Sequence, residues 1–324
     1  MQSEVRISAV PSNNGSHPNN GSGPNNGGSR PNNGGSGPNN GGSGRIVKLI
    51  KRTLEDLRIS AAAAGFALRH GKGNGFFKTF FFRKAIEIQH ISPFRRIFGR
   101  PITTAELQLP YFGNARLVFD FTDPFQMAIC EEFVKYNIYD LDLIRFEPDE
   151  IIDGGAYRGY FTFLARRRFH SSRLTCVEPH PGNFKELKSS LESNKIGDFT
   201  LYNNALSKSR SHIQLEIWGS NTARFGEKSP SGEYIEIATL DLTDLLKAVP
   251  AGKSLLLKVD IEGSELDFFP QCIDLLPAKC AVFLETHDGW TSLNNIKDRF
   301  ESAGFKFSVL RDRDLYIDSL AVRE

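Results

Sequence analysis

An apolar run that ends in an acidic residue and a glycine-rich turn constrains the fold of this chain more than any other feature. Residues 150–161 read Glu-Ile-Ile-Asp-Gly-Gly-Ala-Tyr-Arg-Gly-Tyr-Phe, which predicts a strand ending at Asp153 and a helix beginning near Arg158. A strand, a tight turn and a helix are the unit from which open α/β sheets build nucleotide sites. Acidic residues also end or follow the expected strands at 174–178 and 254–260. Three such motifs in this order predict a ligand at the carboxyl ends of the strands.

The expected elements alternate from residue 150 onward. Strands are expected at 151–153, 174–178, 199–203, 254–260 and 281–285, and helices at 159–169, 181–194, 264–276 and 292–303. Strand-like runs at 105–109, 116–121, 212–218 and 234–239 lie outside this alternation. The chain ends in two strand-like runs, 306–310 and 315–317, around a polar turn. This order predicts an α/β fold with a mostly parallel sheet, helices on both faces and a C-terminal antiparallel hairpin.

Composition excludes some classes of protein. Lys and Arg total 40 and Asp and Glu total 38, and this near-balance gives no reason to expect nucleic-acid binding. The four cysteines form no C-x-x-C pair, and three lie in apolar runs, which favours reduced, buried thiols. The first residues lack the pattern of a secretory signal, and no run of 18 apolar residues occurs. We therefore expect a cytoplasmic protein.

The N-terminal third divides into two parts. Residues 1–44 contain a Pro-Asn-Asn-Gly repeat with almost nothing to bury, which predicts a disordered tether. Residues 45–104 form a helical and Phe-rich segment before the main domain at 105–324. The basic helix expected at 45–70 either packs on the neighbouring domain, which we favour, or contacts an anionic membrane or a partner. The aromatic run at 76–82 is expected in a core, with a lid over the substrate as the alternative.

The glycine spacing decides between adenosyl cofactors. A dinucleotide site requires G-x-G-x-x-G, and Ala156 replaces the middle glycine here. A carboxylate at Asp153 would repel a pyrophosphate, whereas it would attract the amino group of S-adenosylmethionine. The spacing Asp153-x-Gly155-x-x-x-Gly159 resembles that of the class I methyltransferases. Glu178, at the end of the second strand, is placed to accept both hydroxyls of a ribose.

Four segments together resemble the FkbM-type methyltransferases. They are residues 153–156, 177–179, 204–206 and the Lys-x-Asp-x-Glu-Gly-x-Glu element at 258–265, and the resemblance covers about residues 116–288. It implies a class I, Rossmann-like methyltransferase fold and S-adenosylmethionine-dependent O-methylation. The acceptor would be a hydroxyl of a small molecule, a sugar or glycolipid, or a polyketide-like product. The chain departs from many members at Tyr157, where they carry Asn, although an aromatic ring there can cover a sulfonium.

Site residues follow from this resemblance and from the strand order. The turn after Asp153 would hold the methionine end of the cofactor, Glu178 the ribose, and Asn204 with Ala205 the adenine. The cofactor-binding residues predicted in this way are Asp153, Gly155, Ala156, Tyr157, Gly159, Phe161, Glu178, Pro179, Asn204, Ala205 and Asp260.

Asp260, Glu262, Glu285 and His287 are expected at the same rim of the sheet, at the ends of adjacent strands, and the catalytic residues are expected among them. Methyl transfer to a hydroxyl benefits from a base. His287, directly after a strand, is the favoured base, with Asp260 and Glu262 as the other catalytic candidates. Glu265 is expected to stabilise the N-terminus of the following helix instead. A cluster of Asp260, Glu262, His287 and Asp288 could bind a divalent cation. No ligand spacing in the sequence supports such a site, so no metal is predicted.

Two other functions fit the sequence less well. A nicotinamide-dependent oxidoreductase would need the missing middle glycine, and the chain shows no evident Tyr-x-x-x-Lys proton relay. A cofactor-binding scaffold without catalysis is the alternative outside enzymes, and Tyr157 is the hint for it.

Overall fold

The computed structural model describes residues 6–7, 104–120, 124–208, 211–218, 222–224, 232–261, 265–287, 289–313 and 316–324. The tether predicted for 1–44 and the segment predicted for 45–104 lie outside these ranges, except for Arg6–Ile7 and Thr104. Arg6–Ile7 forms a short strand, β1, that pairs in parallel with β6 (Phe199–Tyr202). The described chain is otherwise the domain predicted from residue 105 onward.

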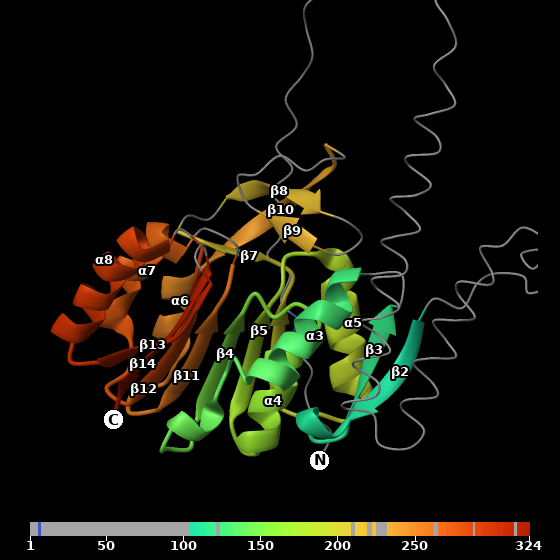
Figure 1. Ribbon diagram of the computed structural model, residues 1–324, viewed down its shortest axis with the longest axis horizontal. Coiled ribbons are helices and arrows are strands. Elements are labelled where there is room, and N and C mark those ends of the chain that lie inside the picture. Colours follow the sequence, from blue (N-terminus) through green and yellow to red (C-terminus); the bar gives the residue numbers. More distant parts are fainter. Residues whose placement is uncertain are drawn as a thin grey trace, which may run out of the picture. The chain divides into compact units, whose positions relative to one another are not determined.

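A mixed sheet forms the centre of the domain (Figure 1). Its strands lie in the order β1-β6-β5-β4-β11-β12-β14-β13. Besides β1 and β6 these strands are β4 (Glu150–Gly154), β5 (Arg173–Val177), β11 (Leu255–Val259), β12 (Cys280–Thr286), β13 (Lys306–Arg313) and β14 (Tyr316–Arg323). β4, β5, β6, β11 and β12 run parallel, and β14 is antiparallel to both β12 and β13. The predicted α/β fold, with a mostly parallel sheet and a C-terminal hairpin, is confirmed.

Helices cover both faces of the sheet, as predicted. Ile151 and Leu256 pack in one core cluster with side chains of α3, α4 and α5, whereas Ile152 and Leu257 pack in a second cluster with α6, α7 and α8. These helices are α3 (Pro124–Tyr136), α4 (Tyr160–Arg168), α5 (Pro181–Ser193), α6 (Leu242–Ala248), α7 (Glu265–Cys272) and α8 (Gly289–Ser302). Neighbouring residues of one strand point to opposite faces. A strand that is buried on both faces must therefore be apolar almost throughout.

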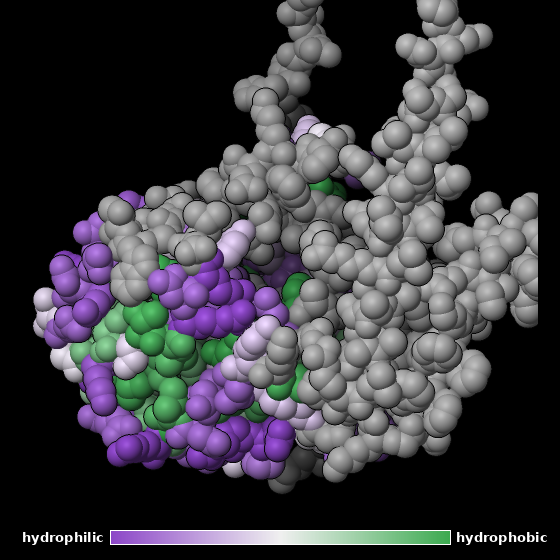
Figure 2. Space-filling view, in the orientation of Figure 1, coloured by the Kyte–Doolittle hydropathy of each residue, from purple (hydrophilic) through white to green (hydrophobic). Residues whose placement is uncertain are grey.

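The apolar residues of α8 determine which side of this helix faces the core. Leu293, Ile296 and Phe300 recur at helical spacing in α8 and are fully buried. The outer side of α8 is hydrophilic (Figure 2). α8 begins at Gly289, a little before the predicted start at residue 292.

Two smaller sheets flank the central one. β7 (Ala205–Ser207), β10 (Tyr234–Asp241), β8 (His212–Trp218) and β9 (Thr222–Arg224) form the first, in the order β7-β10-β8-β9. β2 (Thr104–Leu109) and β3 (Ala115–Asp120) form an antiparallel pair joined by η2 (Pro110–Phe112). Short 3₁₀ helices also occur at η3 (Leu141–Leu143) and η4 (Ile273–Leu275), and η4 takes over the end of the helix predicted at 264–276. Among the described helices, none has the length and apolar character needed to cross a membrane.

Candidate active site

The turn between β4 and α4 is tightly packed against the loop that follows β11. Gly155 has a φ of +74°, and a Cβ at this position would lie 1.8 Å from the backbone oxygen of Asp260. Gly159 has a φ of +88°, and its Cβ would lie 2.6 Å from Leu187 Cδ1. Both positions therefore require glycine. The sequence attributed these glycines to close approach of a ligand, whereas the structure shows that neighbouring protein atoms fill the space.

Glu178 joins this turn to the start of α5. Its Oε2 accepts a hydrogen bond from the Tyr157 backbone N–H (2.7 Å), and its Oε1 accepts one from His180 N–H (2.8 Å). Asn183 Nδ2 donates to Oε1 at a longer 3.4 Å. The carboxyl group is 5% exposed, and this burial raises its pKa to about 7, although the two backbone N–H groups oppose the rise. Glu178 thus lies where it was predicted, at the carboxyl end of β5 and beside the turn after β4.

Asp153 is buried beneath the turn. Its side chain has no exposed surface, and Oδ2 accepts a hydrogen bond from Thr162 Oγ1 (2.5 Å). Burial raises the pKa of Asp153, while the nearby Lys258 ammonium opposes the rise. The role predicted for Asp153 toward the amino group of the cofactor stays a prediction, and in this structure protein atoms enclose its carboxylate.

Lys258 connects Asp153 to the accessible surface. Its Nζ donates to the Gly155 carbonyl (2.6 Å) and lies 3.5 Å from both Asp153 Oδ1 and Asp260 Oδ2. Burial opposes the charge of this ammonium, but Asp260 and Asp153 outweigh that effect and raise its pKa. The Asp260 side chain is 28% exposed, so it is the accessible end of this chain of charges.

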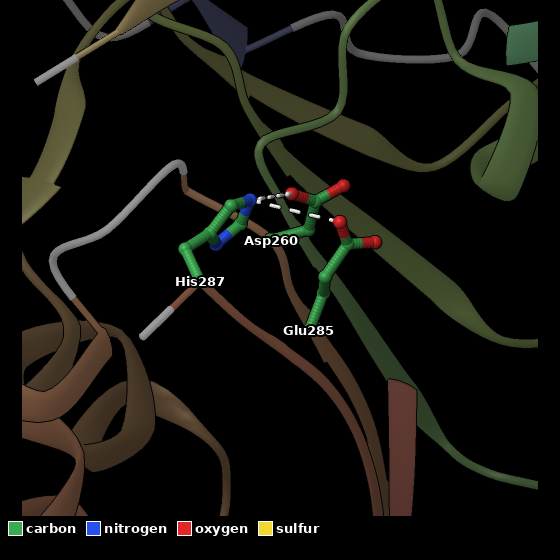
Figure 3. Close-up of side chains that lie close together, drawn as sticks. All are labelled: Asp260, Glu285 and His287. Carbon is green, nitrogen blue, oxygen red and sulfur yellow. Dashed lines mark ion pairs between the residues drawn. The ribbon is translucent and has the colours of Figure 1, made fainter. Parts of the chain in front are cut away.

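Asp260, Glu285 and His287 point toward one another at the ends of β11 and β12 (Figure 3). His287 Nε2 lies 3.6 Å from Glu285 Oε1 and 3.9 Å from Asp260 Oδ1. On the other side of the ring, Nδ1 lies 2.9 Å from Oε1 of the buried Glu265. We call Asp260, Glu285 and His287 the rim triad. The sequence placed all three at this rim, and Glu262 and Asp288, which it also placed there, lie outside the described residues.

The C-terminal hairpin completes the surroundings of the rim triad. The Arg313 guanidinium lies 3.1 Å from Glu285 Oε2 and 3.2 Å from both Asp318 Oδ1 and Glu132 Oε2. Burial raises the pKa of Glu285 well above its ordinary value, and the charges of Asp260 and Asp318 raise it further. Burial also raises the pKa of Asp318, with Arg313 opposing.

Sequence reasoning missed the contribution of this hairpin. It treated the residues around Arg313 as a polar turn. The usable signal was an acidic residue at position 318 inside an otherwise apolar strand, since such a residue needs a partner. Tyr316 also packs edge-on against the His287 ring, with 5.2 Å between centroids.

Comparison with known proteins identifies the domain. Residues 153–307 match the family model described as the methyltransferase FkbM domain. The chain carries an FkbM methyltransferase domain. The protein is therefore an S-adenosylmethionine-dependent methyltransferase, and the nicotinamide-dependent oxidoreductase considered above is set aside. The FkbM match contains the β4–α4 turn, Glu178 and the rim triad, and it extends past the predicted end of the resemblance at residue 288.

Several relatives resemble the chain. "Methyltransferase 1" of Beauveria bassiana (strain ARSEF 2860) is 26% identical over 209 residues, which cover 56% of this chain and 83% of that protein. Precorrin-6y C5,15-methyltransferase from Geobacter metallireducens GS-15 is 13% identical, with a TM-score of 0.37 over 59% of this chain and 88% of that one. A SAM-dependent O-methyltransferase from Thermotoga maritima is 13% identical, with a TM-score of 0.35 over 58% and 63% of the two chains.

Glu178 fits the ribose of S-adenosylmethionine. Oε2 has a further lone pair beyond the one used by the Tyr157 backbone N–H, whereas Oε1 accepts from both His180 N–H and, at a longer 3.4 Å, Asn183 Nδ2. One ribose hydroxyl can therefore bind Oε2 directly, and a second at Oε1 would replace the long contact to Asn183 while both backbone contacts stay. Asp153 is enclosed, and Lys258 lies between it and Asp260. Of these two carboxylates, only Asp260 is accessible from outside the protein.

Three other residues predicted to bind the cofactor, Phe161, Ala156 and Asn204, are buried among other residues of the protein. Phe161 is fully buried and packs edge-on against Tyr139 and Phe283, and Ala156 is also buried. Asn204 is buried, and its Nδ2 donates to the Ala238 carbonyl (3.2 Å).

The remaining predicted residues lie around the turn and the end of β6. Ala205 is buried within β7, and Pro179 is half-buried. The Tyr157 ring is half-buried, and the Arg158 guanidinium lies over it at 5.4 Å. Asn203, which the sequence did not single out, donates from Nδ2 to the carbonyls of Glu178 (2.9 Å) and Pro179 (3.0 Å). Asn203 is therefore the residue that ties the end of β6 to the predicted ribose site.

Proposed function

We propose that this FkbM methyltransferase transfers its methyl group to a hydroxyl oxygen of a small-molecule or glycan acceptor. The observation that carries the proposal is the rim triad, which groups two carboxylates and an imidazole beside the cofactor turn. A hydroxyl must lose its proton as the new C–O bond forms, and these are the side-chain types that handle a proton near neutral pH. The resemblance to FkbM-type enzymes, whose acceptors are hydroxyls, supports the same conclusion.

The residues of the site have distinct tasks in this reaction. S-adenosylmethionine would supply a methyl group made electrophilic by its positive sulfur: the C–S bond breaks as the C–O bond forms, and a neutral thioether leaves. The hydroxyl proton passes through the rim to solvent. Glu178 holds the ribose and thereby fixes the cofactor beside the turn. The Asp260 backbone N–H donates to the Gly154 carbonyl (3.2 Å), so the rim is attached directly to that turn. An acceptor bound at the rim is therefore aligned with the reacting carbon, and alignment is the main requirement of an in-line displacement.

The overall charge of the protein supports a small acceptor. A formal net charge of +2 gives no reason to expect a polynucleotide as the acceptor. Glycans and small polyols have several hydroxyls that can bind carboxylates such as Asp260 and Glu285.

Isotope labelling tests which atom receives the methyl group. The purified chain is incubated with S-adenosylmethionine carrying a ¹³C-methyl group and with pairs of acceptors that differ only in hydroxyl versus amino substitution. We expect ¹³C NMR to show O-methyl products from the hydroxyl acceptors. Labelled methyl groups on nitrogen or carbon instead would contradict the proposal.

Three variants test the rim in the same assay. Glu285→Gln and His287→Ala should lose turnover while binding S-adenosylmethionine normally by calorimetry, because neither residue is among those predicted to bind the cofactor. His170→Ala, at an exposed histidine after α4, is the matched control and should retain full turnover. Unchanged turnover in both rim variants would show that the rim takes no part.

A further inference from the structure

We propose that the rim triad binds one divalent first-row cation, and that this cation holds the acceptor oxygen. The ligands would be one carboxylate oxygen each from Asp260 and Glu285 and the Nε2 atom of His287. No metal was predicted from the sequence, because no ligand spacing supported one, and the cluster considered there did not include Glu285. The role of the cation in holding the acceptor oxygen rests on the proposed function. The cation site itself rests only on the geometry of the rim triad.

The distances within the rim triad suit a bound ion. One donor atom from each residue can be chosen so that all lie within 4.8 Å of one another. The separations of 3.6 Å and 3.9 Å from His287 Nε2 are too long for hydrogen bonds. A cation with ligands at about 2.0–2.2 Å requires donor atoms about 3–4 Å apart. Small side-chain movements would therefore bring all three donors into contact with one ion.

Glu265 supplies an independent indication. Histidines that bind metals almost always donate their other ring N–H to a carboxylate, which fixes the tautomer and the ring orientation. Glu265 is 1% exposed, and its Oε1 lies 2.9 Å from His287 Nδ1. Because an ionised carboxylate can only accept, a ring proton belongs on Nδ1, and in the neutral imidazole the lone pair of Nε2 is on the side of Asp260 and Glu285. The same Glu265 oxygen also accepts from the Ile261 backbone N–H (3.2 Å), which holds it in place.

The charges around the rim triad also favour a cation. Five carboxylates gather here, namely Asp153, Asp260, Glu265, Glu285 and Asp318, and the basic residues that contact them are Lys258 and Arg313. Lys258 lies on the Asp153 side and Arg313 on the Asp318 side. A divalent ion between Asp260 and Glu285 would add positive charge in the middle, where the described residues place only His287.

The mixed donor set indicates the kind of ion. Carboxylates suit Mg²⁺ and Mn²⁺, whereas an imidazole suits Mn²⁺ and the later first-row ions better than Mg²⁺. Three protein ligands leave coordination positions open for an acceptor oxygen. An ion at this site would lower the pKa of a bound hydroxyl, and the hydroxyl proton would leave to solvent past the exposed side of Asp260. His287 then acts as a ligand and not as the free base that the sequence favoured.

Manganese binding to the full chain tests the site without any acceptor. After treatment with EDTA, the protein is titrated with Mn²⁺ and free Mn²⁺ is followed by electron paramagnetic resonance. We expect one ion per chain, with electron spin echo modulation from the imidazole nitrogen. Glu285→Gln and His287→Gln should weaken binding, and the nitrogen modulation should vanish in the second. Glu265→Gln should weaken binding by about tenfold, as expected for a residue that acts through a ligand.

Controls separate loss of the site from loss of the fold. Asp142→Asn, at an exposed surface carboxylate, should leave Mn²⁺ binding unchanged, and every variant should bind S-adenosylmethionine like the original protein. If Glu285→Gln fails to fold, the nitrogen signal and its loss in His287→Gln decide the question.

Three results would overturn the cation site. They are a protein that binds no Mn²⁺, one whose Mn²⁺ shows no nitrogen coupling, and one whose affinity ignores the rim variants. Methyl transfer to hydroxyls by EDTA-treated protein would remove the cation while leaving the proposed function intact. Mn²⁺ binding without any O-methyl product would do the reverse.

Discussion

The two sides of the site are held together by different kinds of contact. On the cofactor side, Glu178 accepts backbone N–H groups, and Gly155 packs directly against a backbone carbonyl. On the rim side, Glu285, Arg313 and Asp318 interact through their side chains. The cofactor side comes from neighbouring elements of the chain, whereas the rim brings together residues from α3 to β14. The backbone contacts therefore hold the cofactor turn in one conformation. The arrangement of the rim depends instead on the charges of its side chains.

The largest expected effect concerns backbone packing on the cofactor side. Gly155→Ala places a Cβ 1.8 Å from the Asp260 oxygen at a φ of +74°, so the turn and the neighbouring loop must separate. We expect a loss of about 4 kcal/mol or more in the free energy of unfolding, measured by denaturant titration. Gly252→Ala is the control, because Gly252 has a φ of +79° but no atom within 4 Å of its Cβ. It should cost only the backbone strain of about 1–2 kcal/mol, and equal losses in the two variants would show that the packing at Gly155 is unimportant.

The next effect concerns the charge that joins the two sides. Lys258→Met leaves Asp153 buried without its cationic neighbour, and removal of one partner of a buried pair costs about 3–5 kcal/mol. Lys253→Met is the control: Lys253 lies closer to its partner, 2.7 Å from Asp149, but is half exposed. Urea titration should show a large loss for Lys258→Met and almost none for Lys253→Met. The reverse order would mean that distance, and not burial, governs these pairs.

The smallest effect is a pH dependence on the cofactor side. Because burial raises the pKa of Glu178 to about 7, the ionised form that accepts ribose hydroxyls is the minor form in acid. We expect the affinity for S-adenosylmethionine to fall about tenfold from about pH 8 to about pH 6, by calorimetry.

The contribution of Glu178 to the free energy of unfolding changes with pH in the opposite direction to the affinity for S-adenosylmethionine. The folded state holds this proton more tightly than the unfolded state, so the contribution is full below the ordinary value of 4.5 and is lost as the pH rises through about 7. Glu178→Gln should remove both dependences. An affinity profile that keeps its shape in Glu178→Gln would assign the titration to another group.

The strand, the turn and the position of Glu178 on the cofactor side could be predicted because one short stretch of sequence encodes them. The strand ending at Asp153, the turn and the carboxylate at Glu178 all follow from residues close in the chain. Burial was harder to predict: Asp153 and Phe161 were expected at the ligand but are enclosed by protein, because their exposure depends on helices packed elsewhere.

The rim was predicted only in part. The end of a parallel strand is a sound guide to position, so Asp260 and His287 were expected near each other. Arg313 and Asp318 were not expected there, since an antiparallel hairpin brings them in from the C-terminus. Pairing between distant strands depends on register, and a single sequence does not specify register where both faces are buried and apolar.

The contact between Gly155 and the Asp260 carbonyl has a consequence for how this enzyme can vary. The atom that excludes a side chain at position 155 belongs to the main chain, and every amino acid carries the same one. No replacement at position 260 can make room for a larger residue at 155, so the defect has no second-site suppressor there. Directed evolution of the acceptor specificity can therefore change side chains around the rim triad, but it must keep the main chain of Asp260 in its present place against Gly155.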